Sequence, residues 1–134
     1  MTAPRLIRKV PLEIEVHCMI ADVLRQGLAP GWLWWHTPNG GERPAFINAK
    51  GKRVSIEAAR LKRMGAKPGV SDFLLLSPIG DFHALELKRE GETPTDDQTV
   101  FLAAVARAGC KSAWVDNFDD AMRILRDWGA LRIR

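Results

Sequence analysis

Three charged side chains interrupt an apolar stretch in the middle of the chain, GVSDFLLLSPIGDFHALELKRE (residues 69–90). They are Asp72, Glu86 and Lys88, and their neighbours are typical of buried strands. Burying an unpaired charge costs free energy, so a strand normally keeps its ionic groups on a wet face or at one end. Two carboxylates and an ammonium in this setting therefore need partners, which a divalent metal and a phosphate would supply.

Strand geometry predicts how these charges meet. Successive side chains of a strand point to opposite faces, so Glu86 and Lys88 share one face, and His83, with no expected role, lies on the other. If the flanking strands pair through a turn at 77–81, Asp72 comes close to Glu86. Two converging carboxylates favour a hard ion, Mg²⁺ or Mn²⁺, and the lysine is placed to orient the attacking water or stabilise charge on a phosphate. A solvated surface ion pair is the alternative for Glu-x-Lys.

The elements that must position these residues follow from periodicity and turn chemistry. Thr93 and Pro94 are the expected N-cap and first residue of the third helix, and Asn117 is the candidate cap of the fourth. The order α, β, α, β, β, α, β, α predicts an α/β (α+β) fold with a central mixed sheet flanked by helices. Helices are expected over 11–27, 55–64, 94–108 and 117–129, and strands over 32–37, on both sides of 77–81, and over 111–116.

Length and composition bound the class of protein. The chain has 134 residues, of which 46% are hydrophobic and 27% charged, as is typical of one globular domain with a single core. No apolar run approaches the ~20 residues needed to cross a bilayer, and the N-terminus lacks the apolar core of a signal peptide. Cys18 and Cys110 are too few for a disulfide framework or a zinc-ligand set. We therefore expect a single domain, residues 1–134, in the cytoplasm and without a membrane partner.

The positive charge of the chain is concentrated in one segment. The net charge is only +4, but residues 50–67, KGKRVSIEAARLKRMGAK, are rich in lysine and arginine and have Glu57 as their single acid. A concentrated basic segment is what a polyanion such as DNA requires, although a solvated helix face would have the same composition. Lys50, Lys52 and Arg53 are the DNA-binding candidates in this segment.

Together these motifs resemble a known nuclease family. Ser71-Asp72 followed by Glu86-Leu87-Lys88 matches the signature of the PD-(D/E)xK nucleases. The segments HTPNGGER, GAKPGVSD and ELKREGETPTDDQ and the final strand and helix resemble the VRR-NUC branch of that superfamily, over residues 13–126. The resemblance implies a restriction-endonuclease-like core and a Mg²⁺- or Mn²⁺-dependent DNA endonuclease of the DNA repair type. It also implies selectivity for four-way Holliday junctions and a homodimer.

The resemblance assigns roles to individual residues of the site. It makes Asp72 and Glu86 metal ligands, together with the backbone carbonyl of Leu87. It makes Lys88 the catalytic lysine, and Gln98 matches the family's helix glutamine that closes the site.

The family also carries a glutamate on its first helix. We expect this residue to be Glu13, a catalytic residue and metal ligand, because apolar residues follow it at helical intervals. Glu15 is the alternative, and it points about 200° away around the helix. Two positions depart from the family pattern, because Ser71 replaces a proline and His17 stands where a glutamine is common.

Further DNA-binding candidates lie around the glycine loop. Asn39 and Arg43 are placed in it, and its glycines would let a phosphate approach the backbone closely. His36 precedes the loop and is expected either at the scissile phosphate or hydrogen-bonded to a backbone carbonyl. Of the three tryptophans in residues 32–35, at least two are expected in the core, and stacking on DNA bases is the alternative.

Other functions find less support in the sequence. The chain has no phosphate-binding Gly-Lys-Ser/Thr loop and no Gly-x-Ser-x-Gly elbow, and its histidines show no zinc spacing. Two alternatives stay open: a less selective endonuclease acting on flaps, nicks or plain duplex, and a DNA-binding or partner-binding module that does not cleave.

Overall fold

The computed structural model describes residues 9–38 and 46–132. The predicted order of four helices and four strands is confirmed, and two further strands of two residues each precede the second helix. Such short strands leave no periodic signal in a sequence. In the described part of the chain, none of the helices combines the length and hydropathy that crossing a bilayer requires. The elements are α1 (Glu13–Gly27), β1 (Leu33–His36), β2 (Phe46–Ile47), β3 (Arg53–Val54), α2 (Ile56–Arg63), β4 (Phe73–Leu76), β5 (Phe82–Leu87), α3 (Asp96–Arg107), β6 (Lys111–Val115) and α4 (Phe118–Asp127).

The central sheet has four strands in the order β1-β4-β5-β6. β1 pairs antiparallel with β4, and β4 pairs antiparallel with β5 through the turn at 77–81. β5 and β6 are parallel, and α3 forms the crossover between them. The predicted mixed sheet is therefore confirmed. β2 and β3 form a separate antiparallel pair.

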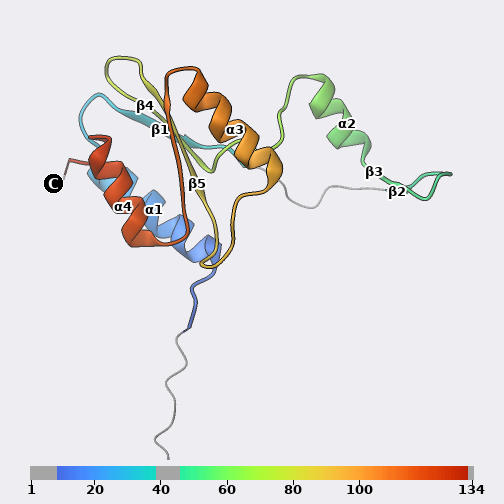
Figure 1. The fold of residues 1–134 in the computed structure, drawn as a ribbon, viewed down its shortest axis with the longest axis horizontal. Helices are drawn as coiled ribbons and strands as arrows, with labels where there is room; N and C mark the ends of the chain where they lie inside the picture. Colours follow the sequence, from blue (N-terminus) through green and yellow to red (C-terminus); the bar gives the residue numbers. More distant parts are fainter. Residues whose placement is uncertain (1–8, 39–45, 133–134) are drawn as a thin grey trace, which may run out of the picture.

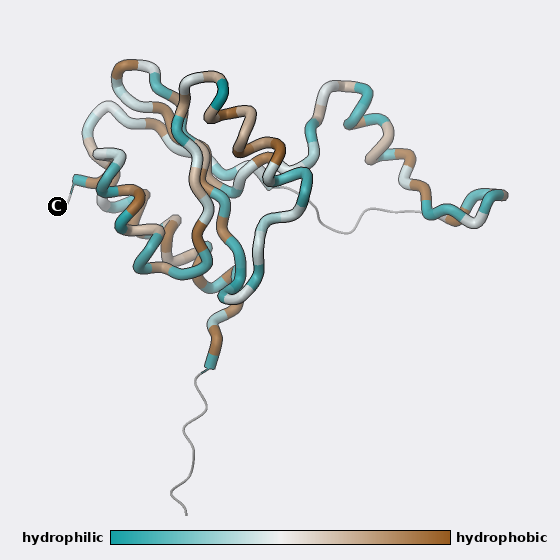
Figure 2. The backbone as a smooth tube through the Cα atoms, in the orientation of Figure 1, coloured by the Kyte–Doolittle hydropathy of each residue, from teal (hydrophilic) through white to brown (hydrophobic). Residues whose placement is uncertain are grey.

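Helices cover both faces of this sheet (Figure 1). α1 and α4 contact each other on one face, where Phe73, Leu75 and Leu85 contribute to the main core. α3 lies on the other face, where Leu74 and Ala84 form a smaller cluster with it. Hydrophobic positions follow the strands of the central sheet, whereas hydrophilic and hydrophobic positions alternate along the segment around α2 (Figure 2). The alternation of side chains along β4 and β5 thus divides the core between two faces.

The tryptophan segment contributes to the core as predicted. Trp32 and Trp34 are half-buried and pack against the main core, whereas Trp35 is 38% exposed. His83 is buried between the rings of Trp32 and Trp128, with ring centroids at 5.0 and 4.9 Å. It lies on the face opposite Glu86, as the strand alternation predicts.

The start of α3 corrects a prediction. The helix begins at Asp96 with Thr95 as its N-cap, so the prediction of Thr93 as cap and Pro94 as first helical residue is wrong. Thr95 Oγ1 accepts a hydrogen bond from the Gln98 N–H at 3.3 Å, and Gln98 Oε1 accepts one from the Thr95 N–H at 2.9 Å. This capping box satisfies two backbone donors at once, which a proline in the first turn does not do.

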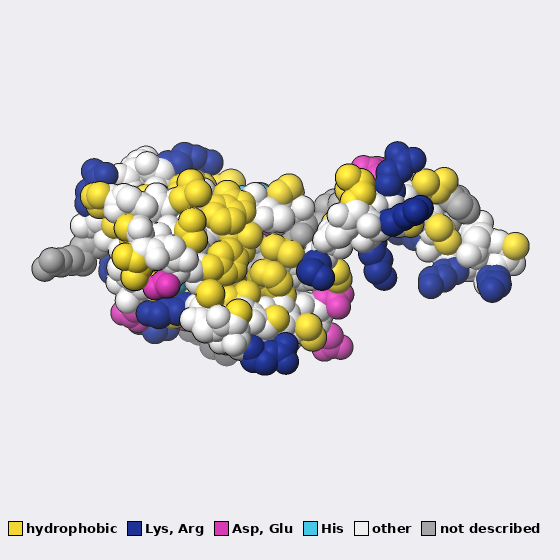
Figure 3. Space-filling view, turned by 90° about the horizontal axis from the view of Figure 1, so that it is seen from above, with side chains coloured by type: hydrophobic (Ala, Val, Ile, Leu, Met, Phe, Trp, Pro, Cys, Tyr) yellow, Lys and Arg dark blue, Asp and Glu magenta, His cyan; other side chains and the backbone are white. Residues whose placement is uncertain are grey.

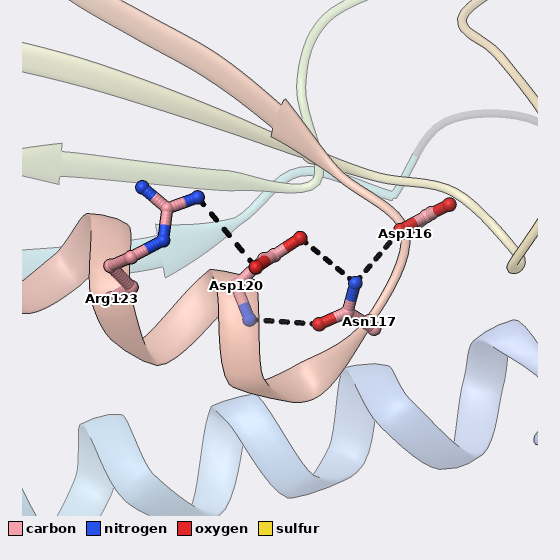
Figure 4. Close-up of polar contacts among 4 residues, drawn as sticks. All are labelled: Asp116, Asn117, Asp120 and Arg123. Atoms are coloured by element: carbon pink, nitrogen blue, oxygen red, sulfur yellow. Dashed lines mark hydrogen bonds and ion pairs between the residues drawn. The ribbon is translucent and has the colours of Figure 1, made fainter.

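Asn117 caps α4 as predicted (Figure 4). Its Oδ1 accepts the Asp120 N–H at 2.8 Å, and its Nδ2 donates to carboxylate oxygens of Asp116 and Asp120, each at 2.9 Å. Arg123 follows Asp120 by about one helical turn, and its Nη2 lies 3.6 Å from Asp120 Oδ1. These contacts fix the tight passage from β6 into the helix.

Residues 46–67, which hold β2, β3 and α2, extend away from the sheet and its helices (Figure 1). We call them the arm and the rest of the described chain the body. Every residue of α2 is half-buried or exposed, and lysine and arginine side chains follow the arm on the face seen in Figure 3. Ser55 caps α2, because its Oγ accepts the Ala58 N–H at 3.1 Å. The predicted basic helix therefore forms outside the core.

Candidate active site

Asp72 and Glu86 meet at one end of the β4–β5 pair. Phe73 pairs with Leu85 in the antiparallel register, so one further step along the same ladder places Asp72 opposite Glu86. The Leu87 N–H donates a hydrogen bond to Asp72 Oδ2 at 2.8 Å, which fixes the aspartate across the two strands. The approach of these carboxylates, expected from the turn at 77–81, is present in the structure.

Glu86 is a buried acid with an incomplete set of partners. It is 2% exposed, and its Oε2 has no hydrogen-bond partner among the described residues. Burial raises the pKa of Glu86 to about 9, with further contributions from the charge of Asp72 and a hydrogen bond with it. The positive charge of Lys88 opposes this rise in pKa without cancelling it. A buried acid of this kind fits a site for a cation, because an ion would compensate the charge that burial penalises.

Glu13, the first residue of α1, lies within electrostatic reach of this pair. Burial raises the pKa of Glu13, and the negative charge of Asp72 raises it further, while Lys88 lowers it. Glu13 is half-buried, whereas Glu15 is exposed. Of the two candidate glutamates, Glu13 is therefore the one that the helix turns toward the carboxylates.

Lys88 is held in place from α3. Its Nζ donates to Gln98 Oε1 at 3.3 Å, and its backbone N–H donates to the Val115 carbonyl at 2.9 Å. Gln98 Oε1 also accepts the Thr95 N–H, so the capping box of α3 and the lysine share one oxygen. The residue that the resemblance assigns to closing the site thus contacts the predicted catalytic lysine.

A close approach of two chain segments explains the second glycine of GAKPGVSD. Gly69 has φ +79°, and a Cβ at this position would lie closer than 3.0 Å to the backbone of Asp97 and Gln98. Any larger residue would push the start of α3 away from the segment that leads to Asp72. The glycine therefore keeps Gln98 beside Lys88.

Two histidines also lie beside Asp72. One ring nitrogen each of His17 and His36 and a carboxylate oxygen of Asp72 all lie within 4.8 Å of one another. His36 Nδ1 is 2.7 Å from the Asp72 carbonyl oxygen, which is the backbone contact expected as the alternative to a phosphate contact. Burial lowers the pKa of His17, the charge of His36 lowers it further, and Asp72 raises it.

The proximity of His17 and His36 to each other was not predicted from the sequence. His17 follows Glu13 by one helical turn, so helix periodicity alone places it on the face that carries Glu13. His36 required the β1–β4 register, because only its pairing with Phe73 brings it next to Asp72.

The remaining DNA-binding candidates lie in the arm or outside the described residues. Lys50 and Lys52 are exposed in the turn between β2 and β3, and Arg53 is exposed at the start of β3. Asn48 organises this turn, since its Oδ1 accepts the N–H groups of Lys50 and Lys52 at 3.0 Å each. The predictions for Asn39 and Arg43 fall in residues 39–45, outside the described residues.

An open groove of about 820 Å³ lies between the arm and the body. Lys62 and Lys67 line it from the arm, and Thr37 and Val70 line it from the body. Val70 is two residues from Asp72 in the sequence. Most of the lining is apolar, and Lys62 and Lys67 give the groove positive charge.

Comparison with known proteins concerns the fold. No protein-family model matches the chain, and neither does any curated protein. Among solved structures, a VRR_NUC domain protein matches with a TM-score of 0.65 and 19% sequence identity, over 88% of this chain and 88% of that chain. This chain has the fold of a VRR_NUC domain protein. The fold that the sequence resemblance implies is therefore confirmed. Any catalytic activity depends on the residues at the end of the β4–β5 pair.

Proposed function

We propose that this protein is a metal-dependent DNA endonuclease, formed by a single domain over residues 1–134. The observation that carries the proposal is Glu86, buried opposite Asp72 with an oxygen that has no partner among the described residues. A buried acid beside a second carboxylate costs folding free energy, and a surface that only binds DNA gains nothing from it. The VRR_NUC fold supports the same function.

The chain offers oxygen donors for Mg²⁺ or Mn²⁺. Asp72, Glu86 and Glu13 would hold the ion, together with the backbone carbonyl of Leu87, and carboxylate and carbonyl oxygens suit both metals. The raised pKa values of Glu86 and Glu13 fit this assignment, because a cation would favour their charged forms. The bound metal supplies positive charge to the scissile phosphate and a more acidic attacking water.

The Lys88 ammonium supplies positive charge at the proposed site. Its Nζ donates to a neutral amide oxygen of Gln98, so the contact orients the ammonium without neutralising it. The ammonium can then donate hydrogen bonds to a phosphate oxygen as negative charge develops there. Gln98 acts through Lys88 and is a positioning residue for it.

The arm and the groove would bind the DNA backbone. Lys50, Lys52 and Arg53 contact phosphates at the tip of the arm, and Lys62 and Lys67 contact them in the groove. Asn39 and Arg43, which lie outside the described residues, complete the proposed DNA-binding set. Phosphate contacts of this kind position DNA without reading its sequence.

We further propose that four-way junctions are the preferred substrate and that the active form is a homodimer. One Asp–Glu–Lys site cuts one strand per encounter, whereas a junction is resolved by cuts in two symmetry-related strands. A two-fold dimer supplies two equivalent sites facing those strands.

The proposal is tested with a panel of four-way junction, flap, nicked, single-stranded and plain duplex DNA. Cleavage is expected with Mg²⁺ or Mn²⁺ and fastest on the junction; full activity in EDTA would refute the metal site. Mixing wild-type and Lys88→Ala chains should give heterodimers that nick junctions without resolving them. A monomer by light scattering that still makes paired cuts would refute the dimer, and equal rates on all substrates would leave a general endonuclease.

A further inference from the structure

Asp72 has two sets of candidate ligands beside it. Glu86 and Glu13 are its acidic neighbours, and His17 and His36 are its imidazole neighbours. The three ligand atoms of the histidine set lie within 4.8 Å of one another and come from α1, β1 and the residue before β4. Segments far apart in sequence thus place two imidazoles beside one carboxylate.

The two imidazole rings are oriented by packing. The His17 ring stacks on Phe73 with centroids 4.4 Å apart and planes at 26°. The His36 ring meets His17 edge-on, with centroids 4.5 Å apart and planes at 77°. Because Phe73 is fully buried, the rings rest on a rigid support.

The tautomer of His36 follows from its backbone contact. The Asp72 carbonyl oxygen can only accept a hydrogen bond, so His36 Nδ1, 2.7 Å away, carries the proton and donates it. Nε2 then keeps its lone pair. Histidines that bind a metal through one ring nitrogen usually donate the N–H of the other to a backbone carbonyl or carboxylate, and His36 has this arrangement.

From this geometry we propose a second metal site, formed by His17, His36 and Asp72, that binds a divalent transition metal in preference to Mg²⁺. Imidazole nitrogen binds Co²⁺ and Zn²⁺ well and Mn²⁺ more weakly, whereas Mg²⁺ prefers oxygen ligands. Metal–ligand bonds of about 2.0–2.2 Å put neighbouring ligand atoms roughly 3–3.5 Å apart, a spacing that the three ligand atoms, all within 4.8 Å of one another, can reach by small side-chain movements.

Asp72 has the capacity to serve both sites. A carboxylate offers about four lone-pair positions, and one of its oxygens accepts the Leu87 N–H. The aspartate can therefore serve one ion together with Glu86 and another together with the histidines, as a carboxylate does in two-metal sites. The inference extends the proposed nuclease site, with which it shares Asp72, but it is tested by metal binding alone.

The experiment titrates the untagged, metal-free protein with Mn²⁺ and with Mg²⁺ by calorimetry, and with Co²⁺ by visible absorption. Wild type should bind two Mn²⁺ ions but one Mg²⁺ ion, and Co²⁺ should show the spectrum of a nitrogen-ligated ion. His17→Gln and His36→Gln should each weaken the second Mn²⁺ site by at least about 100-fold and remove that spectrum, because each deletes a ligand. Mg²⁺ binding should stay unchanged.

Controls separate this inference from the proposed function. His83→Gln removes the third histidine, which lies away from the cluster between two tryptophans, and should leave both Mn²⁺ sites intact. Glu86→Gln should lose the oxygen-rich site while keeping the nitrogen-ligated Co²⁺ spectrum. Since His36 is exposed, its variant keeps the test valid even if His17→Gln unfolds. A single Mn²⁺ ion in wild type, or Co²⁺ spectra unchanged in both histidine variants, would overturn the second site whether or not the protein cleaves DNA.

Discussion

The body and the arm handle charge in opposite ways. In the body, Asp72 and Glu86 are brought together at a strand end, and Glu86 is 2% exposed. In the arm, Lys50, Lys52 and Arg53 stand exposed at a hairpin turn. The acids are held at a cost in free energy that packing of the core offsets, whereas the bases cost almost nothing because water solvates them.

We interpret this difference as a separation of two tasks between the body and the arm. A site that performs chemistry needs groups fixed within a fraction of an ångström, which only neighbours locked by packing can provide. A surface that follows a flexible polyanion needs charge without a fixed geometry. Substitutions in the two regions should therefore fail in different ways, and four predictions test this comparison in order of decreasing effect.

The largest effect is expected for the body. Asp72→Ala, Glu86→Ala and Lys88→Ala should each lower the cleavage rate by about 10³-fold or more, because each removes a proposed metal ligand or the ammonium proposed to act on the phosphate. DNA affinity in binding assays should change by less than about threefold, since the arm remains. Single-turnover cleavage and fluorescence anisotropy measure the two quantities.

A matched pair on α1 sharpens this prediction. Glu13→Ala should slow cleavage, whereas Glu15→Ala, two residues away and exposed, should not. Equal effects of both changes would contradict the assignment of Glu13 to the site.

The second effect concerns binding by the arm. Changing Lys50, Lys52 and Arg53 together to Gln should weaken DNA binding by about 10–100-fold at low salt. Each lost phosphate contact should lower the slope of log affinity against log salt by about 1, while the cleavage rate of saturated DNA persists. The control changes Arg123, Arg126 and Arg132, which lie at the C-terminal end of the body. If the salt slope stays the same in the arm variant, the basic segment is only a solvated face.

The third effect concerns stability. The pKa of Glu86 is raised to about 9 in the folded protein, so between the unfolded value of about 4.5 and 9 the folded state binds the extra proton. The free energy of unfolding of the metal-free protein should therefore fall as pH rises through this window. Glu86→Gln should flatten that dependence and raise stability by about 1–3 kcal/mol at the alkaline end, because a neutral amide can donate to Asp72.

Urea unfolding at several pH values in EDTA measures this difference. Glu57→Gln, an exposed change in α2, is the control and should follow wild type. Adding Mg²⁺ should stabilise wild type most at high pH and stabilise Glu86→Gln least. A pH dependence that survives in Glu86→Gln would assign the buried charge to another residue.

The smallest effect tests how the helix cap supports the site. Thr95→Ala and Asn117→Ala each remove an N-cap, and each should cost about 1 kcal/mol of unfolding free energy. Only Thr95→Ala should also slow cleavage, by about three- to tenfold, because Gln98, the capping-box partner of Thr95, also accepts the hydrogen bond from Lys88. An equal loss of activity in both variants would mean that the cap acts through general stability.

Local pattern determined the elements and much of the chemistry. The alternation in β5 predicts Glu86 and Lys88 on one face and His83 on the other, and the short turn at 77–81 predicts the approach of Asp72. The helix spans, the mixed sheet and the Asn117 cap follow from signals within a few residues. The start of α3 was predicted wrongly because two threonines compete there, and only Thr95 has a glutamine three residues later.

The tertiary structure decided the contacts between distant segments and the degree to which each acid is buried. The His17–His36–Asp72 cluster depends on the β1–β4 register and on α1 packing over Phe73, which no local pattern encodes. The choice of Glu13 over Glu15 and the raised pKa of Glu86 depend on how deeply each acid is buried once the helices dock. Periodicity reports which face a residue occupies, but desolvation and long-range pairing exist only after the chain has packed.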